Sequence, residues 1–299
     1  MLRTACEVGT LLVSAKVPQA ADDPNVSLLV LQQLSSCEVK KSQSAMNYFA
    51  PQSAAERYAK GRPYFHPYVV SRIKAYLSLA EPVTRALDVG CGTGLSTISL
   101  KAIARYIVGI DNSAEMIALA PVDSQIEYFV ASAEKIPADA SDFDLITLSS
   151  VFHWINRSAF FVEARRVLRP GGWLIVYDNY FSARMEENRA FQRWGREHYF
   201  TRYPSPPRAH VSFGTEDVQK DGFQFIGQED YQNIVKFSVE TLVDYLVTQS
   251  NIIAAVEGGT ENIEDVRQWL TQSVTPFFEG RAEATFLFRG PIWYLRPSM

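Results

Sequence analysis

Three glycines and one aspartate give the sequence its most specific chemical signal. Gly90, Gly92 and Gly94 follow an apolar run and precede a segment with helical periodicity. Glycine permits positive φ and lets a ligand approach the backbone, and the first N–H groups of a helix face whatever lies in such a turn. Asp111 ends the next apolar run, about 20 residues further on, where a carboxylate can accept ribose hydroxyl groups. The pattern therefore predicts a site for a ligand that contains a nucleoside.

The spacing of the glycines separates two classes of nucleoside ligand. A dinucleotide fingerprint, G-x-G-x-x-G, receives a pyrophosphate at the helix N-terminus. Here the glycines follow G-x-G-x-G, and Leu95 occupies the place of the third dinucleotide glycine. An NAD(P)-dependent oxidoreductase is therefore the disfavoured alternative. Two structural interpretations stay open: a plain tight turn at the glycines, and a helix cap at Asp111, a role that Ser113 suits better.

Alternating strands and helices are predicted around these residues, over 83–178. Strands are expected at 85–89, 107–110, 126–131, 143–148 and 173–177, with helices beginning near Gly94, Ser113 and Ser158. Residues 170–172 are expected to end the last of these helices. This alternation is typical of a parallel sheet with crossover helices.

The flanking segments have different patterns. Residues 1–45 are expected to be a poorly ordered, dispensable extension, with Met46 as a candidate start. Residues 46–82 predict a helical segment, with one helix opening at 65–67. Residues 179–299 predict a helical insertion and C-terminal strands: amphipathic helices at 242–246 and 263–277, and strands at 231–237 and 284–295 that complete the sheet.

Composition narrows the partners. A chain of 299 residues, 47% apolar, can bury one substantial core, and a net charge of −4 argues against a nucleic-acid partner. Cys6, Cys37 and Cys91 are too few and too scattered for a disulfide framework or a metal cluster, which favours a cytoplasmic location. No apolar run reaches the roughly 18–20 residues of a membrane span, so no stable membrane insertion is expected. The sequence does not predict an oligomeric state.

Five motifs occur in the order found in class I S-adenosylmethionine-dependent methyltransferases, and the chain resembles that family. The motifs are residues 88–94, 109–111, 133–134, 143–145 and 168–172. The chain is most similar to the small-molecule branch that includes trans-aconitate methyltransferases, firmly over 46–178 and loosely beyond. The resemblance implies an α/β fold with a Rossmann-like seven-stranded sheet, helices on both faces and a helical insertion or lid. It also implies S-adenosylmethionine as the cofactor and a small-molecule acceptor.

The resemblance assigns the glycine turn to the cofactor. The backbone from Gly90 to Gly94, including Cys91 and Gly92, would cradle the methionine and ribose parts. Asp88 would hold the amino end, Asp111 would take the ribose hydroxyls, and Asn112 would also be among the cofactor-binding residues.

Further residues are assigned to the adenine and the reacting methyl. Met116 would pack against the adenine, although a core methionine fits as well. Ala133 and Glu134 follow the third strand, where the family reads the adenine edge. Ser132 stands where many members carry an acidic residue. Ser149, which ends the fourth strand, would lie beside the methyl.

Two pairs of residues are candidates for the lid and the acceptor site. Tyr58 would cover the cofactor and Arg62 would pair with its carboxylate, with an ordinary surface helix as the alternative. His153 would orient a substrate or accept a proton, beside Trp154, although both residues could simply pack at a helix start. We expect the acceptor site at the C-terminal edge of the sheet.

The implied mechanism is in-line transfer of a methyl group from a sulfonium to a nucleophile. Because the donor is already activated, the protein mainly positions the partners and excludes water, and no metal is required. A carboxylate acceptor needs no base, whereas a hydroxyl or a carbon acid would use His153. A methyltransferase-like protein that binds cofactor without catalysis is the other alternative.

Overall fold

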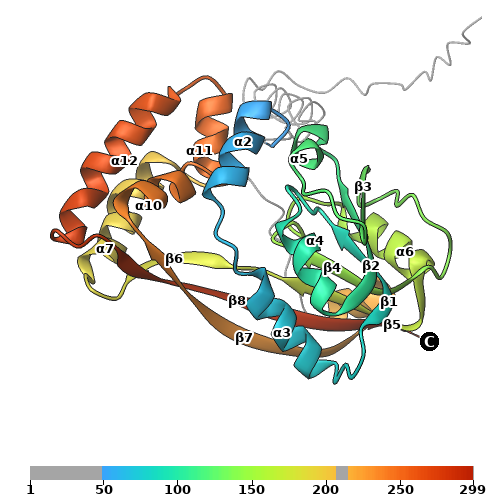
Figure 1. Cartoon of the computed structure of the whole chain (residues 1–299). Coiled ribbons are helices and arrows are strands. Elements are labelled where there is room, and N and C mark those ends of the chain that lie inside the picture. Colours follow the sequence, from blue (N-terminus) through green and yellow to red (C-terminus); the bar gives the residue numbers. More distant parts are fainter. Residues whose placement is uncertain (1–48, 207–214, 299) are drawn as a thin grey trace, which may run out of the picture. The chain divides into compact units, whose positions relative to one another are not determined.

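A single mixed sheet organises the part of the chain that the structure describes. The computed structural model describes residues 49–206 and 215–298, so the predicted extension over 1–45 lies outside it. The sheet has eight strands, with β3-β2-β1-β4-β5-β8-β6 as neighbours and β7 paired with β8 (Figure 1). The strands are β1 Val83–Val89, β2 Ala104–Asp111, β3 Ile126–Val130, β4 Phe143–Ser149, β5 Leu168–Tyr177, β6 Tyr180–Met185, β7 Phe223–Phe237 and β8 Ala284–Pro297.

The parallel half of the sheet confirms the five strands predicted over 83–178. β1 to β5 pair in parallel, and each overlaps its predicted range. The helix before β5 ends at Val167 rather than at residues 170–172, because Leu168 is already extended and begins the strand. Those residues form an irregularity in β5, with Gly171 at a φ of +78°.

The whole sheet has eight strands, one more than the seven predicted, and the additional strand lies in its antiparallel half. β8 pairs with β5 over residues 292–295 and with β6 over residues 286–289. On its other side β8 pairs with β7 along its whole length. The two long strands therefore run from the core into the C-terminal helical region, as Figure 1 shows.

The helices near the parallel strands connect or precede them. They are α2 Gln52–Gly61, α3 His66–Tyr76, α4 Leu95–Ser99, α5 Ala114–Ala118 and α6 Arg157–Val167. Alternate side chains of a strand point to opposite faces of a sheet. Accordingly, Ala86 packs with Val70 and Ile73 of α3 in one apolar cluster, whereas Leu87 packs with Phe160 of α6 in another.

The insertion between β6 and β8 has a core of its own, rich in aromatic side chains. Its helices are α7 Ala190–Trp194, α8 Phe200–Arg202, α9 Thr215–Lys220, α10 Val239–Leu246, α11 Ser250–Glu257 and α12 Ile263–Phe278. Phe191, Trp194, Tyr199 and Tyr203 are buried in it with residues of α10 and α12. These aromatics therefore fill the core of the insertion rather than line its surface.

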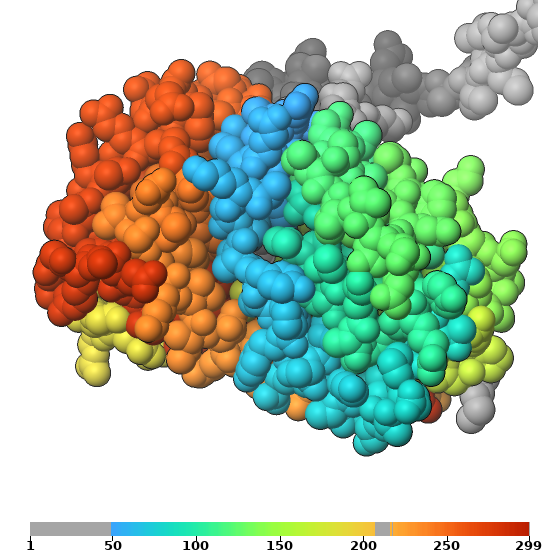
Figure 2. Space-filling model, in the orientation of Figure 1, coloured from blue at the N-terminus to red at the C-terminus, as the bar shows by residue number. Residues whose placement is uncertain are grey.

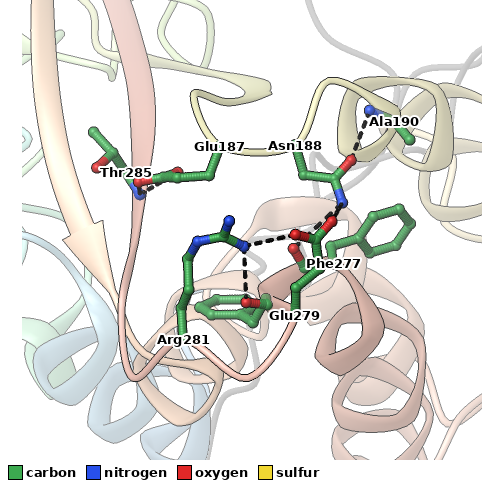
Figure 3. A network of polar contacts seen from close by, with 8 residues as sticks. Glu187, Asn188, Ala190, Phe277, Glu279, Arg281 and Thr285 are labelled. Atoms are coloured by element: carbon green, nitrogen blue, oxygen red, sulfur yellow. Dashed lines mark hydrogen bonds and ion pairs between the residues drawn. The ribbon is translucent and has the colours of Figure 1, made fainter.

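A polar network fastens the start of the insertion to its end (Figure 3). Both carboxylate oxygens of Glu187 accept from the backbone N–H of Thr285, at 2.9 and 3.0 Å. The Asn188 amide donates to Glu279, which also accepts from Arg281. The loop after β6 is thereby held to the α12–β8 connection.

Helix α2 is held between the core and the insertion. Figure 2 shows the blue surface of this helix between the green core and the orange insertion. Lys60 binds Asp244 of α10 at 2.9 Å, and Arg57 binds Glu257 of α11. A Cβ at Gly61 would lie 2.2 Å from the Asp244 carbonyl oxygen, so this close backbone approach requires glycine. Among the described residues, no helix is long and apolar enough to cross a bilayer.

Candidate functional site

The glycine turn follows β1 at the C-terminal edge of the sheet. Gly90, Gly92 and Gly94 have φ values of +68°, +54° and +81°, which other residues rarely adopt. The N–H groups of Gly90 and Cys91 donate to the Ile110 carbonyl at 2.8 and 3.0 Å, which ties the turn to β2. The turn is therefore fixed by backbone bonds as well as by its glycines.

The three glycines differ in what surrounds them. A Cβ at Gly90 would lie 2.4 Å from Val151, and one at Gly94 would lie 2.5 Å from the Tyr128 hydroxyl. Among the described residues, a Cβ at Gly92 would have one neighbour within 4 Å, the ring of Tyr58 at 3.9 Å. The described residues therefore leave space at Gly92, bordered by Tyr58. That this space is the cradle of the cofactor stays a prediction.

Asp111 lies directly beside this space. Its carboxylate accepts from the Gly92 N–H and from the Ser113 N–H, both at 2.9 Å. Ser113 itself caps α5 by accepting from the Met116 N–H, which confirms the prediction that Ser113 is the cap. Burial raises the pKa of Asp111, while the backbone N–H groups oppose that shift. The aspartate therefore borders the turn and does not serve as the cap of α5.

Asp88 lies beneath the turn and is completely buried. It accepts hydrogen bonds from three hydroxyls: Ser96 at 2.5 Å, Thr97 at 2.8 Å and Thr147 at 2.9 Å. Burial raises its pKa to about 6 in spite of these donors. Asp88 thus joins β1, α4 and β4 below the cradle, and its predicted contact with the cofactor's amino end stays a prediction.

The remaining predicted cofactor residues occupy varied environments. Cys91, Met116 and Ala133 are buried, and Asn112 is exposed. Glu134 accepts from the backbone N–H of Asn156 at 2.8 Å, which supports the loop between β4 and α6. Adenine recognition by this set stays a prediction.

The lid candidates Tyr58 and Arg62 lie one above the other. The Arg62 guanidinium lies 4.5 Å from the centre of the Tyr58 ring and 5.6 Å from that of Tyr245. It also donates to the Thr248 carbonyl at 2.9 Å. Tyr58 is therefore close both to the glycine turn and to a cation. Its role as a lid over the cofactor stays a prediction.

Phe49 joins the lid to the predicted acceptor residues. Its ring makes an edge contact with Tyr58, with ring centres 5.7 Å apart, and another with Trp154 at 6.3 Å. The Phe49 carbonyl accepts from the Ser113 hydroxyl. His153 packs beside Trp154, with ring centres 5.0 Å apart. Phe49 was not singled out from the sequence, because nothing local marks an aromatic residue ahead of a helix as part of a site.

The ends of β4 and β5 bring further polar groups to the same edge. Ser149 is paired in register with Tyr177, whose hydroxyl lies 3.0 Å from Nδ1 of His66. Burial, followed by the nearby charge of Arg62, lowers the pKa of His66 to about 3, so its imidazole is neutral. The sequence marks residue 66 only as part of a helix start, and no local signal predicts its pairing with Tyr177.

The buried imidazole makes stability depend on pH. In the unfolded chain His66 has a pKa of about 6.5, so on acidification the unfolded state takes up a proton that the folded state refuses until about pH 3. This contribution destabilises the fold by about 1.4 kcal/mol for each pH unit below 6.5. Asp88 acts in the opposite sense between about pH 6 and 3.8, where the folded state binds the extra proton.

A comparison of His66→Gln with the parent isolates the histidine contribution. Between about pH 7 and about pH 5, the parent should lose about 2 kcal/mol more unfolding free energy than the variant. Urea denaturation at both pH values measures this difference. Equal losses in the two proteins would show that the imidazole is not held neutral.

Among the described residues, no group of three or more His, Cys, Asp or Glu side chains could hold a metal ion.

The family model and the relatives that match this chain in sequence are described as methyltransferases. A family model described as a methyltransferase domain matches residues 87–176. A protein of Dictyostelium discoideum described as a methyltransferase is 26% identical over 215 residues, which cover 71% of this chain and 80% of the relative. The rat mitochondrial ubiquinone biosynthesis O-methyltransferase is 38% identical over 102 residues, 31% of this chain and 30% of the relative.

Comparison of the fold with solved structures also finds a methyltransferase. A solved structure of a type II methyltransferase from Anaeromyxobacter dehalogenans superposes with a TM-score of 0.61 at 20% identity. The match covers 79% of this chain and 97% of the other. At this identity the match shows the fold, which is the Rossmann-like architecture of methyltransferases.

Proposed function

We propose that this chain, a class I S-adenosylmethionine-dependent methyltransferase, transfers the methyl group to an oxygen of a small molecule. The family match and the relatives give the enzyme class and its methyl donor. Neither an NAD(P)-dependent oxidoreductase nor a catalytically inactive binding protein is favoured by them. The acceptor oxygen, in a carboxylate or a hydroxyl, is our proposal.

The observation that carries the proposal is the open cradle over Gly92. It is bordered by the Asp111 carboxylate and covered by Tyr58, so the residues present fit a nucleoside with a short polar side chain. Bound there, S-adenosylmethionine supplies an activated methyl group on a sulfonium. The chain's part is to orient the acceptor at the sheet edge and to exclude water with its aromatic cover.

Two considerations favour an oxygen in a small molecule as the acceptor. The name of the rat relative states that it is an O-methyltransferase of ubiquinone biosynthesis, and ubiquinone is a small molecule. Our proposal also retains the resemblance to trans-aconitate methyltransferases, which would favour a carboxylate as the group that accepts the methyl. If the acceptor is a hydroxyl, His153 remains our candidate base, because it is next to Trp154 near the ends of the strands.

Methyl transfer to a panel of small molecules tests the proposal. The protein is incubated with S-adenosylmethionine carrying a labelled methyl group and with carboxylic acids, phenols, amines and thiols in parallel. We expect label in an oxygen-methylated product from the first two classes. Label only in nitrogen- or sulfur-methylated products would refute the oxygen acceptor, and no label with any class would favour the non-catalytic alternative.

Trp154→Ala is expected to impair turnover more than cofactor affinity. Trp154 is in contact with Phe49 and lies on the loop after β4. Loss of its ring removes an apolar wall from the acceptor side, with a fall in kcat/KM of about tenfold or more. Affinity for S-adenosylhomocysteine should change less than about threefold. Unchanged acceptor kinetics would assign Trp154 to simple packing.

The cytoplasmic location expected from the three scattered cysteines, and the division into a lid segment, a core and an insertion, remain parts of this proposal. So does the preference for a small molecule over a nucleic acid.

A further inference from the structure

Arg62 is directed toward the insertion rather than toward the glycine turn. Its hydrogen bond goes to the Thr248 carbonyl at the end of α10, and its second aromatic neighbour is Tyr245 of the same helix. The ring of Tyr58 is near both this cation and the Gly92 turn. The contacts of the Arg62 guanidinium thus join the lid to the insertion.

The two cations within α2, the helix that precedes Arg62, are already neutralised by carboxylates of the insertion. Arg57 pairs with Glu257, and Lys60 pairs with Asp244. In the ranges 49–206 and 215–298, no carboxylate lies within ion-pair distance of Arg62. A positive charge that is partly buried between aromatic rings without an anion is costly, unless a ligand supplies the anion.

Two buried donors beside this cation also have no acceptor. Nε of Arg62 and Nε2 of Gln249 are shielded from solvent, and within the described chain neither has a hydrogen-bond partner. Gln249 follows Thr248 directly, and its side chain lies beside the Tyr245 hydroxyl. Arg57 of α2 also has an unpaired Nε, but its guanidinium already binds a carboxylate, whereas that of Arg62 does not. Buried N–H groups are nearly always satisfied, so the Arg62 and Gln249 donors are candidate positions for the oxygen atoms of a ligand.

We propose that Arg62 and Gln249 bind an oxyanion of the methyl acceptor, a carboxylate or a phosphate, against the rings of Tyr58 and Tyr245. This inference rests on the proposed function, because it names the substrate class of the same site. It replaces the sequence-based expectation that Arg62 holds the carboxylate of the cofactor. The anchored oxyanion orients the acceptor, whichever of its atoms takes the methyl.

The first arm of the test separates the acceptor from the cofactor as the source of the oxyanion. S-adenosylhomocysteine carries a carboxylate, and 5′-methylthioadenosine has the same nucleoside without the amino-acid part. Calorimetry on the Arg62→Gln variant should show both affinities within about threefold of the parent values. A loss of about tenfold or more for S-adenosylhomocysteine alone would place Arg62 on the cofactor and overturn the proposal.

The second arm measures the preference for an oxyanion. The full-length protein, saturated with S-adenosylhomocysteine, is titrated with phenylacetate and with neutral phenylacetamide, and in parallel with phenyl phosphate. We expect at least one of the two anions to bind about 10- to 100-fold more tightly than the amide, the range for a hydrogen-bonded charge. The better anion tells carboxylate from phosphate. Equal binding of the amide and both anions would overturn the proposal.

Variants assign the preference to the named residues. Arg62→Gln should abolish the preference for an anion over the amide, and Gln249→Ala should reduce that preference. The matched control Lys60→Gln, which removes a cation two residues away, should retain the preference. Arg62→Lys keeps the charge and should keep part of the preference, which covers the case in which Arg62→Gln fails to fold. A preference unaffected in both Arg62 variants would refute the assignment. Absence of S-adenosylhomocysteine binding by the parent would instead count against the proposed function.

Discussion

Replacing Gly92 with alanine should weaken cofactor binding while leaving a folded protein. The new methyl group would project into the space between the turn and Tyr58, whose ring is the one described group within 4 Å. We expect affinity for S-adenosylhomocysteine to fall by about 1.4 kcal/mol or more, which is tenfold. The variant also carries a backbone cost of about 1–2 kcal/mol, since φ at this position is +54°.

Gly171→Ala provides the matched control for this backbone cost. Gly171 has a φ of +78°, and a Cβ there would meet no described residue within 4 Å. Both variants should therefore lose similar unfolding free energy in urea, but only Gly92→Ala should bind the cofactor more weakly. Equal cofactor affinities in the two variants would show that the space above Gly92 is not the cradle.

Asp111→Ala is the substitution with the next largest expected effect. Removing the carboxylate takes away the acceptor for the ribose hydroxyls and leaves the Gly92 and Ser113 N–H groups without their partner. We expect S-adenosylhomocysteine to bind more weakly by about 1–3 kcal/mol, the scale for losing hydrogen bonds to a charged group. Isothermal titration calorimetry measures the difference.

Asp123→Ala controls for the loss of an aspartate that makes the same local hydrogen bond. The Asp123 carboxylate accepts from the N–H two residues later, on Gln125, at 2.9 Å, as Asp111 does from Ser113. It also pairs with Lys101, and it makes no hydrogen bond to Gly92. Cofactor affinity should be unchanged in this control. A comparable loss in both variants would mean that Asp111 acts through general stability and not through the ribose.

The parallel strands and the glycine turn were predictable because their signals are local. β1, β2 and β4 are buried over most of their length, and most of their buried residues are apolar. The turn follows from glycine spacing, since positive φ restricts the residue type. Local patterns thus located the glycine turn and the strand that precedes it.

The antiparallel strands were harder to predict for two physical reasons. β6 is short, and its pairing with β8 is interrupted between Phe181 and Arg184, where Ala183 has a φ of +52°. β7 begins at Phe223, eight residues before the predicted start, because its first half alternates with exposed polar side chains. Neither segment carries the apolar run by which strands were recognised.

The acceptor side depends on contacts between distant segments, which spacing cannot show. Arg62 meets the Thr248 carbonyl across 186 residues, and His66 meets Tyr177 across 111. Gln249 gains significance only because its buried amide lies beside the same tyrosine ring as Arg62. One sequence reveals which residues could do chemistry, whereas the fold decides which of them meet.

Calorimetric titration of the purified protein with S-adenosylhomocysteine, and separately with NAD, tests the central claim most directly. The turn has no third dinucleotide glycine, because Leu95 occupies that position, and the cradle over Gly92 is bordered by Asp111. We predict saturable one-site binding of S-adenosylhomocysteine and no detectable heat of binding with NAD. Tight binding of NAD with none of S-adenosylhomocysteine would contradict the account.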